Sequence, residues 1–297
     1  MIETLTRLDD LRTRVASWKR EGLRVGFVPT MGNLHAGHFS LVELARRLAQ
    51  RVVVSVFVNP TQFGPGEDFD RYPRTPEADA AGLAAAGADA VWMPALDTMY
   101  PHGASAAVQV RVPGITGVLE GEHRPGHFDG VATVVARLLN QVQPDVAVFG
   151  RKDYQQLAVI RYLVRDLAMP VRIEAGATLR EADGLAMSSR NQYLTPDQRP
   201  VAAEIHRTLA WMRQATQAGT PTADVEADAR RQLHDAGFDV DYAVLRTPQL
   251  EVPGDAAGPR VALIAARLGA TRLIDNLEFD VQSAQAVPGP RRAGAGP

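Results

Sequence analysis

Apolar positions follow two different periods in the first half of the chain. Short, mostly apolar runs are typical of strands buried on both faces of a parallel sheet. These runs lie at residues 24–30, 52–58, 90–93 and 145–149. Between them, apolar side chains recur at helical spacing. The helical segments are residues 38–50, 76–86 and 154–167. Strands that alternate with helices predict an α/β fold with a doubly wound parallel sheet.

The pattern changes after about residue 178. Helical segments come first and three strand-like runs follow, at residues 196–218 and 222–236 and then at 239–246, 261–267 and 272–279. Helices followed by consecutive strands predict a smaller α+β domain with an antiparallel sheet. We therefore predict one domain over residues 1–178 and a second over 179–281. Residues 282–297 are rich in Pro, Gly and Ala, which predicts a disordered tail.

Composition narrows the class of protein. The 297 residues include 32 Lys and Arg against 34 Asp and Glu, so a formal charge of -2 gives no electrostatic reason to expect nucleic acid or an anionic membrane. The absence of cysteine excludes disulfides, thiolate nucleophiles and Cys-based zinc sites, and it fits a reducing compartment. The N-terminus is acidic, and no apolar run approaches the ~20 residues of a membrane helix. We expect a soluble cytoplasmic protein.

Residues 29–38, Pro-Thr-Met-Gly-Asn-Leu-His-Ala-Gly-His, join the first of these strands to the first of these helices. Free backbone N–H groups and the helix dipole favour an anion at such a junction. His35 and His38 share one face of the turn, where imidazoles can donate to phosphate oxygens. Two alternatives are a pair that only caps the helix and a metal site, but no third ligand follows at a plausible spacing. The pattern favours phosphate binding.

Two further loops follow strands and fall on the same edge of the sheet, where ligands bind in such folds. Asn59 and Gln62 both donate and accept, which suits a small substrate with hydroxyl and carboxylate groups; turn chemistry alone is an equal alternative. In the loop at residues 150–156, Lys152 can pair with phosphate and Asp153 can bind ribose hydroxyls or cap the helix. A solvated Lys–Asp pair is the alternative there.

A fourth segment follows the predicted domain boundary. Ser188, Ser189 and Arg190 form a cluster suited to phosphate, and their position would let them swing over a nucleotide as a lid. Ser-Ser-Arg by itself is a common loop composition. A polar loop before a helix can contribute Arg124 or His127, although an ordinary surface loop would have the same composition.

These motifs, in this order and spacing, resemble those of the pantoate–β-alanine ligase (pantothenate synthetase) family, within the nucleotidyltransferases that carry a His-x-Gly-His loop. The motifs are residues 29–38, 58–63, 120–128, 150–156 and 187–191, and the resemblance extends to about residue 280. It implies a Rossmann-like first domain, a C-terminal lid domain and a homodimer. It also implies a two-step reaction. ATP and (R)-pantoate give pantoyl adenylate and pyrophosphate, and the amine of β-alanine then displaces AMP.

The resemblance also implies roles for individual residues. ATP would be held by Met31, Gly32, Asn33, Leu34, His35, Ala36, Gly37, His38, Gly150, Arg151, Lys152, Asp153, Leu179, Met187, Ser188, Ser189 and Arg190. His38 would donate a proton to the leaving pyrophosphate, and the further catalytic residues would be His35, Lys152, Arg190, Ser188 and Ser189. Gln62 would contact pantoate and β-alanine, and the other substrate-binding candidates are Gln156, Asn59, Arg124 and His127. Mg²⁺ would accompany the phosphates, with Asp79 as a candidate ligand. Arg151 replaces the Glu or Gln of many relatives.

Three alternatives remain open at this point. A nucleotidyltransferase that makes a dinucleotide shares the superfamily, but the amide side chains and the second domain suit a hydroxy acid followed by an amine. A non-catalytic nucleotide-binding relative would be expected to have lost at least one residue of the set His38, Lys152, Ser188, Ser189 and Arg190, all of which are present. A zinc protein using His35 and His38 would contain stoichiometric zinc, which metal analysis would detect.

Overall fold

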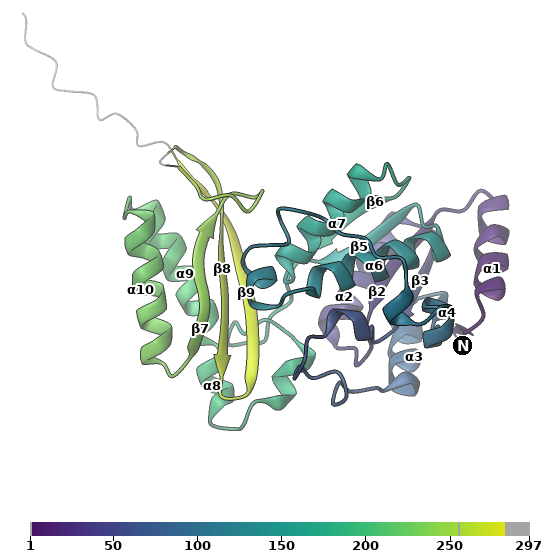
Figure 1. Ribbon diagram of the computed structural model, residues 1–297, viewed down its shortest axis with the longest axis horizontal. Helices are drawn as coiled ribbons and strands as arrows, with labels where there is room; N and C mark the ends of the chain where they lie inside the picture. The colour runs from purple at the N-terminus through teal and green to yellow at the C-terminus, as the bar shows by residue number, and fades with distance from the viewer. Residues whose placement is uncertain (1, 255, 283–297) are drawn as a thin grey trace, which may run out of the picture.

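A computed structural model describes residues 2–254 and 256–282. They form two units, each built on one β-sheet (Figure 1). A six-stranded sheet with its helices forms one side of the molecule, and a three-stranded sheet with two long helices forms the other. The predicted fold class, a Rossmann-like α/β sheet with a smaller C-terminal α+β unit, is confirmed. Residues 283–297 of the predicted tail lie outside the described residues.

All pairings in the larger sheet are parallel, in the order β1-β4-β3-β2-β5-β6. The strands are β1 (Glu3–Leu5), β2 (Val25–Thr30), β3 (Arg51–Val56), β4 (Ala90–Trp92), β5 (Val146–Gly150) and β6 (Arg172–Gly176). From β2 the chain adds strands on one side, and β5 and β6 are then added on the other side. The connections therefore diverge between β2 and β5, which is where ligands bind in open α/β sheets.

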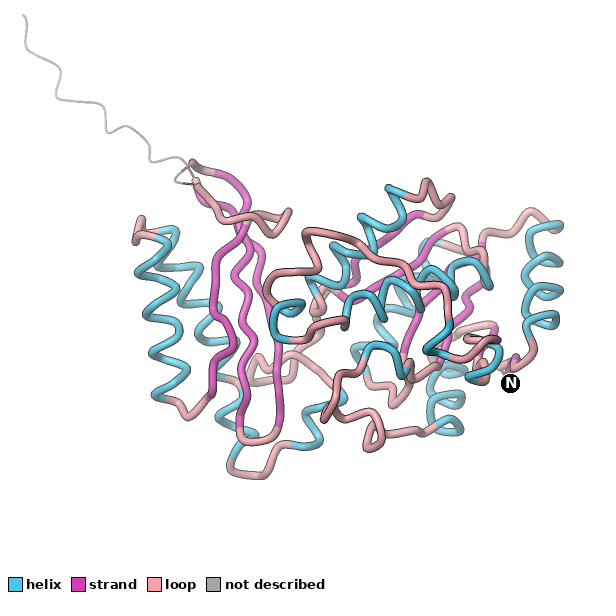
Figure 2. Tube along the Cα trace, viewed as in Figure 1, coloured by secondary structure: helices cyan, strands magenta, loops and turns pink. Residues whose placement is uncertain are grey.

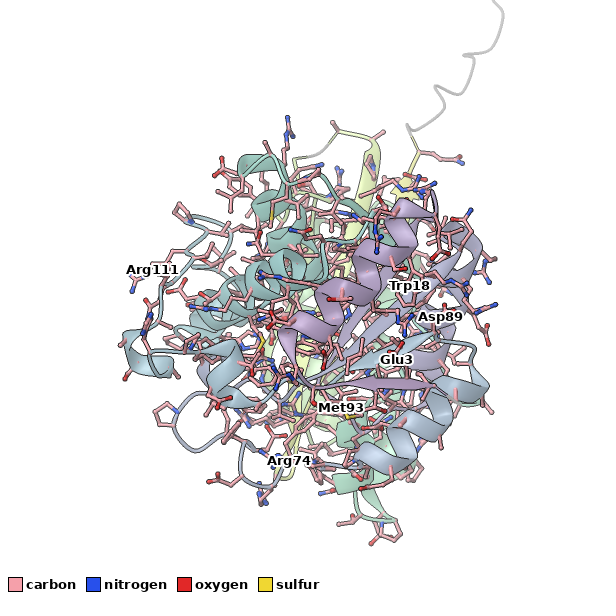
Figure 3. All side chains as sticks on the ribbon, turned by 90° about the vertical axis from the view of Figure 1, so that its right-hand side faces the viewer. Glu3, Trp18, Arg74, Asp89, Met93 and Arg111 are labelled. Carbon is pink, nitrogen blue, oxygen red and sulfur yellow. The ribbon has the colours of Figure 1, made fainter. Side chains whose placement is uncertain are left out.

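Helices cover both faces of this sheet (Figure 2). On β2, Phe27 packs into a cluster with α1 (Leu8–Arg20), α6 (His127–Val142) and α7 (Tyr154–Asp166). The next residue, Val28, packs on the opposite face with α2 (Ala36–Leu48) and α3 (Pro76–Ala85). Figure 3 shows α1, with Trp18, lying beside the edge of the sheet formed by β1. Because both faces are buried, the central strands are apolar at nearly every position.

Short helical segments occupy the loops of this unit. They are η1 (Pro60–Gln62), α4 (Leu96–Met99), η2 (Ala104–Ala106) and α5 (Glu120–His123), and η3 (Ser189–Tyr193) leads into the second unit.

The second unit is an antiparallel sheet, β7-β8-β9, covered by helices on one face. Its elements are α8 (Gln198–Ala202), α9 (Glu204–Gln217), α10 (Thr222–Asp235), β7 (Asp239–Arg246), β8 (Gly258–Leu268) and β9 (Thr271–Val281). Ile264 packs against the helices, whereas Leu263 on the other face joins a cluster with Leu119 and Tyr154 of the first unit. The opposite face of this sheet therefore forms the contact between the two units.

Several elements differ from the sequence prediction, which contained neither strand β1 nor helix α1. The predicted helix at 196–218 is divided at Ala203, where ψ is -13° rather than the α-helical value of about -42°, although the apolar spacing continues across the break. Strand β6 was not predicted, because Arg172 and Glu174 lie on a sheet edge where charged side chains reach solvent. Among the described residues, no helix has both the length and the apolar character needed to span a bilayer.

Candidate active site

The four predicted loops meet where the connections after β2 and β5 diverge, on the side that faces the second unit. Two cavities of about 500 and 210 Å³ lie there. Both are lined by Met31, Gln62, Lys152, Asp153, Gln156, Ser188 and Arg190. Leu179 and Met187, joined by a backbone hydrogen bond of 2.9 Å, line the smaller cavity. Residues far apart in the sequence therefore share one site.

His35 and His38 stand at the N-terminus of α2. Nδ1 of His35 accepts the N–H of Gly37 at 3.1 Å, and Nδ1 of His38 accepts the N–H of His35 at 3.2 Å. A Cβ at position 37 would lie 2.9 Å from the His35 ring, so glycine lets that ring fold over the first turn. Because each Nδ1 accepts a hydrogen bond, each neutral imidazole carries its proton on Nε2.

Burial keeps both imidazoles neutral. It is the main reason why the pKa of His38 falls to about 3 and that of His35 to about 4, with the charge of Lys152 lowering both further. His38 therefore presents an Nε2–H donor, rather than an imidazolium ion, in the ligand-free site at neutral pH. A bound polyphosphate would favour its protonated form, because a nearby negative charge raises the pKa of an imidazole.

We expect His35, His38 and His127 to stay neutral where an ordinary histidine becomes charged. Burial also lowers the pKa of His127 to about 4, so all three should titrate below the ordinary value of about 6.5. As pH falls through that interval, the unfolded chain binds protons that the native state does not, so the free energy of unfolding decreases. Ring-proton NMR from pH 8 to 4 tests this expectation. A normal midpoint for any of the three rings would contradict it.

Asp79 holds the loop between β2 and α2. Its carboxylate accepts the N–H groups of Asn33 (3.0 Å) and Leu34 (2.8 Å) and the hydroxyl of Thr75 (3.2 Å), and the residue is only 2% exposed. These bonds stabilise the left-handed backbone of Asn33, whose φ is +51°. Both oxygens thus serve the loop. Among the described residues, no group of three or more His, Asp and Glu side chains forms a potential metal site.

Lys152 is the cation of the β5 loop that lines both cavities. Its side chain is 18% exposed, and Nζ lies 3.9 Å from the carboxylate of Asp153. The sequence contains 32 basic side chains, of which only Lys152 and Lys19 are lysines. An ammonium group is a compact point charge with three donors, whereas a guanidinium is a planar fork suited to bidentate pairing. In a chain that otherwise uses arginine almost exclusively, a lysine at this position favours a role that needs a point charge.

The second unit positions this loop. The side-chain amide of Asn276, on β9, donates to the carbonyls of Arg151 (3.0 Å) and Lys152 (2.8 Å). The Arg151 side chain is 44% exposed and pairs with Glu278 at 2.7 Å, and Tyr154 donates to the same carboxylate at 3.1 Å. Arg151 lines neither cavity. The replacement of Glu or Gln by Arg therefore affects the contact between the units rather than the cavity walls.

The segment at 188–190 lies against the loop at 29–38. The Ser188 hydroxyl accepts the N–H of Arg190 at 3.3 Å and caps η3, and the Ser189 hydroxyl donates to the carbonyl of Asn33 at 3.1 Å. The Arg190 guanidinium donates to both oxygens of Asp68, at 3.1 and 2.9 Å. These bonds hold the proposed lid segment over the first unit.

Asn59 and Gln62 form the amide side of the site. Asn59 is 1% exposed; its amide group donates to Gln62 (3.1 Å) and to the carbonyl of Gly130 (3.2 Å), and its oxygen accepts from Tyr100 (2.6 Å). A Cβ at Gly130 would lie 2.3 Å from a carbonyl of η1, so glycine allows α6 to approach this closely. Gln62 points its own amide toward the sulfur of Met31, at 3.0 Å. Asn59 therefore positions Gln62.

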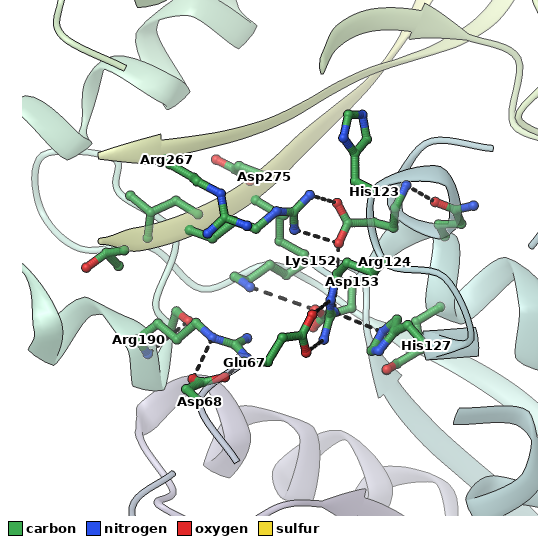
Figure 4. Close-up of a pocket in the computed structure, with 18 of the residues that line it drawn as sticks. Glu67, Asp68, His123, Arg124, His127, Lys152, Asp153, Arg190, Arg267 and Asp275 are labelled. Carbon is green, nitrogen blue, oxygen red and sulfur yellow. Dashed lines mark hydrogen bonds and ion pairs between the residues drawn. The ribbon is translucent and has the colours of Figure 1, made fainter. Parts of the chain in front are cut away.

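Arg124 and His127 line the larger cavity (Figure 4). Arg124 donates to His127 Nε2 at 3.1 Å and binds Glu67 through two bonds, of 2.7 and 2.6 Å. Because Arg124 can only donate, His127 Nε2 accepts and its Nδ1–H donates to the carbonyl of Gln62 at 2.8 Å. This chain of bonds connects the arginine to the amide side of the site.

The loop at 29–38, a partly buried lysine and a patch of amide side chains therefore meet in one cleft. The model of the family described as "Pantoate-beta-alanine ligase" matches residues 3–278 of the chain. The chain belongs to the pantoate–β-alanine ligase family.

Close relatives support this assignment over the full length. A pantothenate synthetase of Xanthomonas euvesicatoria pv. vesicatoria is 68% identical over 280 residues, which are 94% of this chain and 100% of that protein. A pantothenate synthetase structure from Thermus thermophilus is 48% identical with a TM-score of 0.86, covering 93% of this chain and 99% of that one. The pantoate–β-alanine ligase of Francisella tularensis, complexed with "Beta-gamma ATP" and β-alanine, is 30% identical with a TM-score of 0.80 and coverages of 93% and 97%. The ligase reading is thus supported over the dinucleotide-forming alternative.

The sequence did not predict several contacts around the site of this ligase. Arg272 on β9 donates to both oxygens of Glu120, at 2.7 and 2.6 Å, and Tyr242 donates to the same carboxylate at 2.8 Å. The N–H of Glu120 in turn donates to Gln155 at 3.0 Å, next to Gln156. These buried bonds join the second unit to the loop that carries the substrate candidates. No local motif marks the bonds between the units, because Glu120 lies 122 positions from Tyr242 and 152 from Arg272.

Proposed function

We propose that the chain condenses (R)-pantoate with β-alanine in two steps, through pantoyl adenylate, with release of pyrophosphate and then AMP. The observation that supports this most directly is that the two cavities share a set of lining residues. Lys152 and Arg190 belong to this set, with the amides of Gln62 and Gln156. Cations that suit a polyphosphate thus adjoin neutral groups that suit a hydroxy acid.

The first step makes a carboxylate reactive. A free carboxylate is a poor acylating agent, because its leaving group would be oxide; attack on the α-phosphorus of ATP converts it to a mixed anhydride with AMP as leaving group. Negative charge develops on the phosphoryl oxygens and on the departing pyrophosphate. Lys152 and Arg190 would stabilise that charge, and the Nε2–H of His38 would donate to the leaving group. His35, Ser188 and Ser189 would hold the neighbouring oxygens.

The second step joins the amine to the acyl carbon. We assign Arg124 to the carboxylate of β-alanine, because that group stays ionised throughout, whereas the carboxylate of pantoate is consumed. His127, whose Nε2 accepts from Arg124, would position the guanidinium. Gln62 would contact both acids, and Gln156 would contact pantoate. The anhydride must be shielded from water until the amine attacks. The segment at 187–190 and the second unit would form the lid that provides this shielding.

Mg²⁺ would neutralise part of the charge of the bound triphosphate. It commonly binds substrate phosphates through one or two protein carboxylates and keeps several waters. Both oxygens of Asp79 are occupied by the loop at 29–38, and the described residues contain no group of three or more His, Asp and Glu side chains that could hold a metal. We therefore propose that Mg²⁺ enters with ATP and that Asp79 is a positioning residue.

Isotope exchange between ATP and pyrophosphate tests the proposed reaction. The assay contains Mg²⁺ and the chain, with and without (R)-pantoate, and no β-alanine. Exchange that depends on pantoate would support a reversible adenylate and identify the acid. If exchange is absent, AMP should be assayed after β-alanine is added. No AMP with both substrates would contradict the proposal.

Replacing Gln62 by alanine should affect the acids and not the nucleotide. We expect kcat/KM for pantoate and for β-alanine to fall by about 10–100-fold, since a buried amide pairs with a charged carboxylate, while the Kd of ATP changes little. Steady-state kinetics and calorimetry give these values. Gln214→Ala, at an exposed position on α9, is the control. Weaker ATP binding with unchanged use of the acids would show that the loop is misassigned.

We further propose a cytoplasmic homodimer. The proposal is supported by the family resemblance and by the cysteine-free sequence, which suits a reducing compartment. Sedimentation equilibrium of the purified full chain tests the assembly. A single species at the mass of one chain, at all concentrations, would contradict the dimer.

A further inference from the structure

Two consecutive acids of one loop, Glu67 and Asp68, form ion pairs with two arginines of the site (Figure 4). The loop connects η1 to α3. Glu67 accepts bonds of 2.7 and 2.6 Å from Arg124, and Asp68 accepts bonds of 3.1 and 2.9 Å from Arg190. In each pair two N–H groups of the guanidinium face one carboxylate. Arginine uses the same geometry to bind carboxylate and phosphate groups of ligands.

Both carboxylates are ionised competitors at neutral pH. Partial burial is the largest single influence and acts to raise the pKa of Glu67 and of Asp68. The hydrogen bonds and charges of Arg124 and Arg190, together with backbone hydrogen bonds, outweigh it and hold both pKa values below the ordinary range. The pairs are also shielded from solvent, since the side chains of Glu67 and Asp68 are only 25% and 14% exposed. An N–H that donates to one of these oxygens is not available to a substrate oxygen.

We propose that Glu67 and Asp68 are internal substitutes for substrate anions, with Asp68 in the place of an ATP phosphate and Glu67 in the place of the β-alanine carboxylate. This inference rests on the proposed function, which assigns Arg190 and Arg124 to those two anions. Binding of each substrate then exchanges one carboxylate for another anion. The site needs no unpaired buried guanidinium at any stage.

The adjacency of the two acids couples the two substrates. Arg74 donates to the carbonyls of Phe69 and Tyr72, so the rest of the loop is folded back on itself. When a phosphate displaces Asp68 from Arg190, the neighbouring Glu67 is drawn from Arg124. Binding of ATP should therefore tighten binding of β-alanine, and the reverse effect has the same size.

The test measures dissociation constants without turnover. α,β-Methylene-ATP with Mg²⁺ and β-alanine are titrated separately into the full-length wild type and into the variants Asp68→Asn and Glu67→Gln. If a carboxylate holds its arginine most of the time, its removal lowers the apparent Kd by about three- to tenfold. We expect this for the nucleotide in Asp68→Asn and for β-alanine in Glu67→Gln. Asp70→Asn, an exposed acid of the same loop, is the matched control and should bind both as the wild type does.

Equal or weaker binding in the two variants would overturn the inference. A second measurement needs no variant: β-alanine is titrated into the wild type with and without saturating α,β-methylene-ATP. Tightening by the nucleotide is expected, and its absence would contradict the coupling. Pantoate-dependent exchange between ATP and pyrophosphate in the wild type distinguishes failure of this inference from failure of the proposed function. If exchange occurs but Asp68→Asn gains no nucleotide affinity, the inference fails and the proposed function stands; if exchange and AMP formation are both absent, the proposed function fails.

Discussion

Replacing His38 by alanine is expected to slow formation of pantoyl adenylate by about 10²–10⁴-fold, the usual contribution of a positioned proton donor. The reason lies in the hydrogen bonds of the ring. Nδ1 is occupied by the N–H of His35, so Nε2–H is the only proton that His38 can give to the leaving pyrophosphate. Single-turnover release of pyrophosphate from ATP and pantoate measures the step directly.

The loss of this ring also leaves the N–H of His35 without its acceptor, which costs about 1–3 kcal/mol of stability. Thermal unfolding should therefore accompany the kinetics, to show that the variant is folded at the assay temperature. His234→Ala is the control, because that side chain is 83% exposed on α10. Release of pyrophosphate at the wild-type rate in His38→Ala would exclude the proposed role.

Replacing Lys152 by alanine should reduce the rate of the same step by about 10²–10³-fold, comparable to the loss of one donor to a developing oxyanion. Here the Kd of ATP should rise as well, because the ammonium would contact phosphate in the ground state. Lys152→Arg is expected to recover only part of the rate, because the planar guanidinium does not reproduce the point charge of an ammonium group whose side chain is only 18% exposed.

Lys19→Ala is the natural control for this variant. It removes the other lysine of the chain, whose Nζ lies 3.9 Å from Asp145 in a pair that is more than one third exposed. An exposed pair of this kind contributes about 0–1 kcal/mol, so activity should be unchanged. If Lys152→Ala kept the full single-turnover rate, the cation of the β5 loop would have no part in the phosphoryl step.

Local patterns were sufficient for most of the fold. The central strands are apolar throughout because both of their faces are covered, and the motifs lie in the loops that such strands place at one edge. Edge strand β6 escaped prediction because it carries Arg172 and Glu174, which a buried strand would not. The break at Ala203 escaped because backbone torsion leaves no trace in the spacing of apolar residues.

The site was predictable only where a motif is contiguous. Glu67 and Arg124 are 57 positions apart, and Asp68 and Arg190 are 122 apart, so neither pair has a sequence signature. Asp79 illustrates the other limit. An acid near a loop proposed to bind phosphate has the composition of a metal ligand, and the proposed positioning role rests on the two backbone N–H bonds to its oxygens.

Because the chain has only two lysines, the one in the cleft can be followed by selective chemical modification. Apart from the α-amino group, an acylating reagent meets only two amines in the whole chain, one at the surface of α1 and one in the cleft. A tag attached at Lys19 would leave the reaction untouched, whereas modification of Lys152 would report directly on whether the cleft is occupied. The ligase can thus be footprinted at its proposed phosphate site by intact-mass spectrometry, with Lys19 as the internal standard.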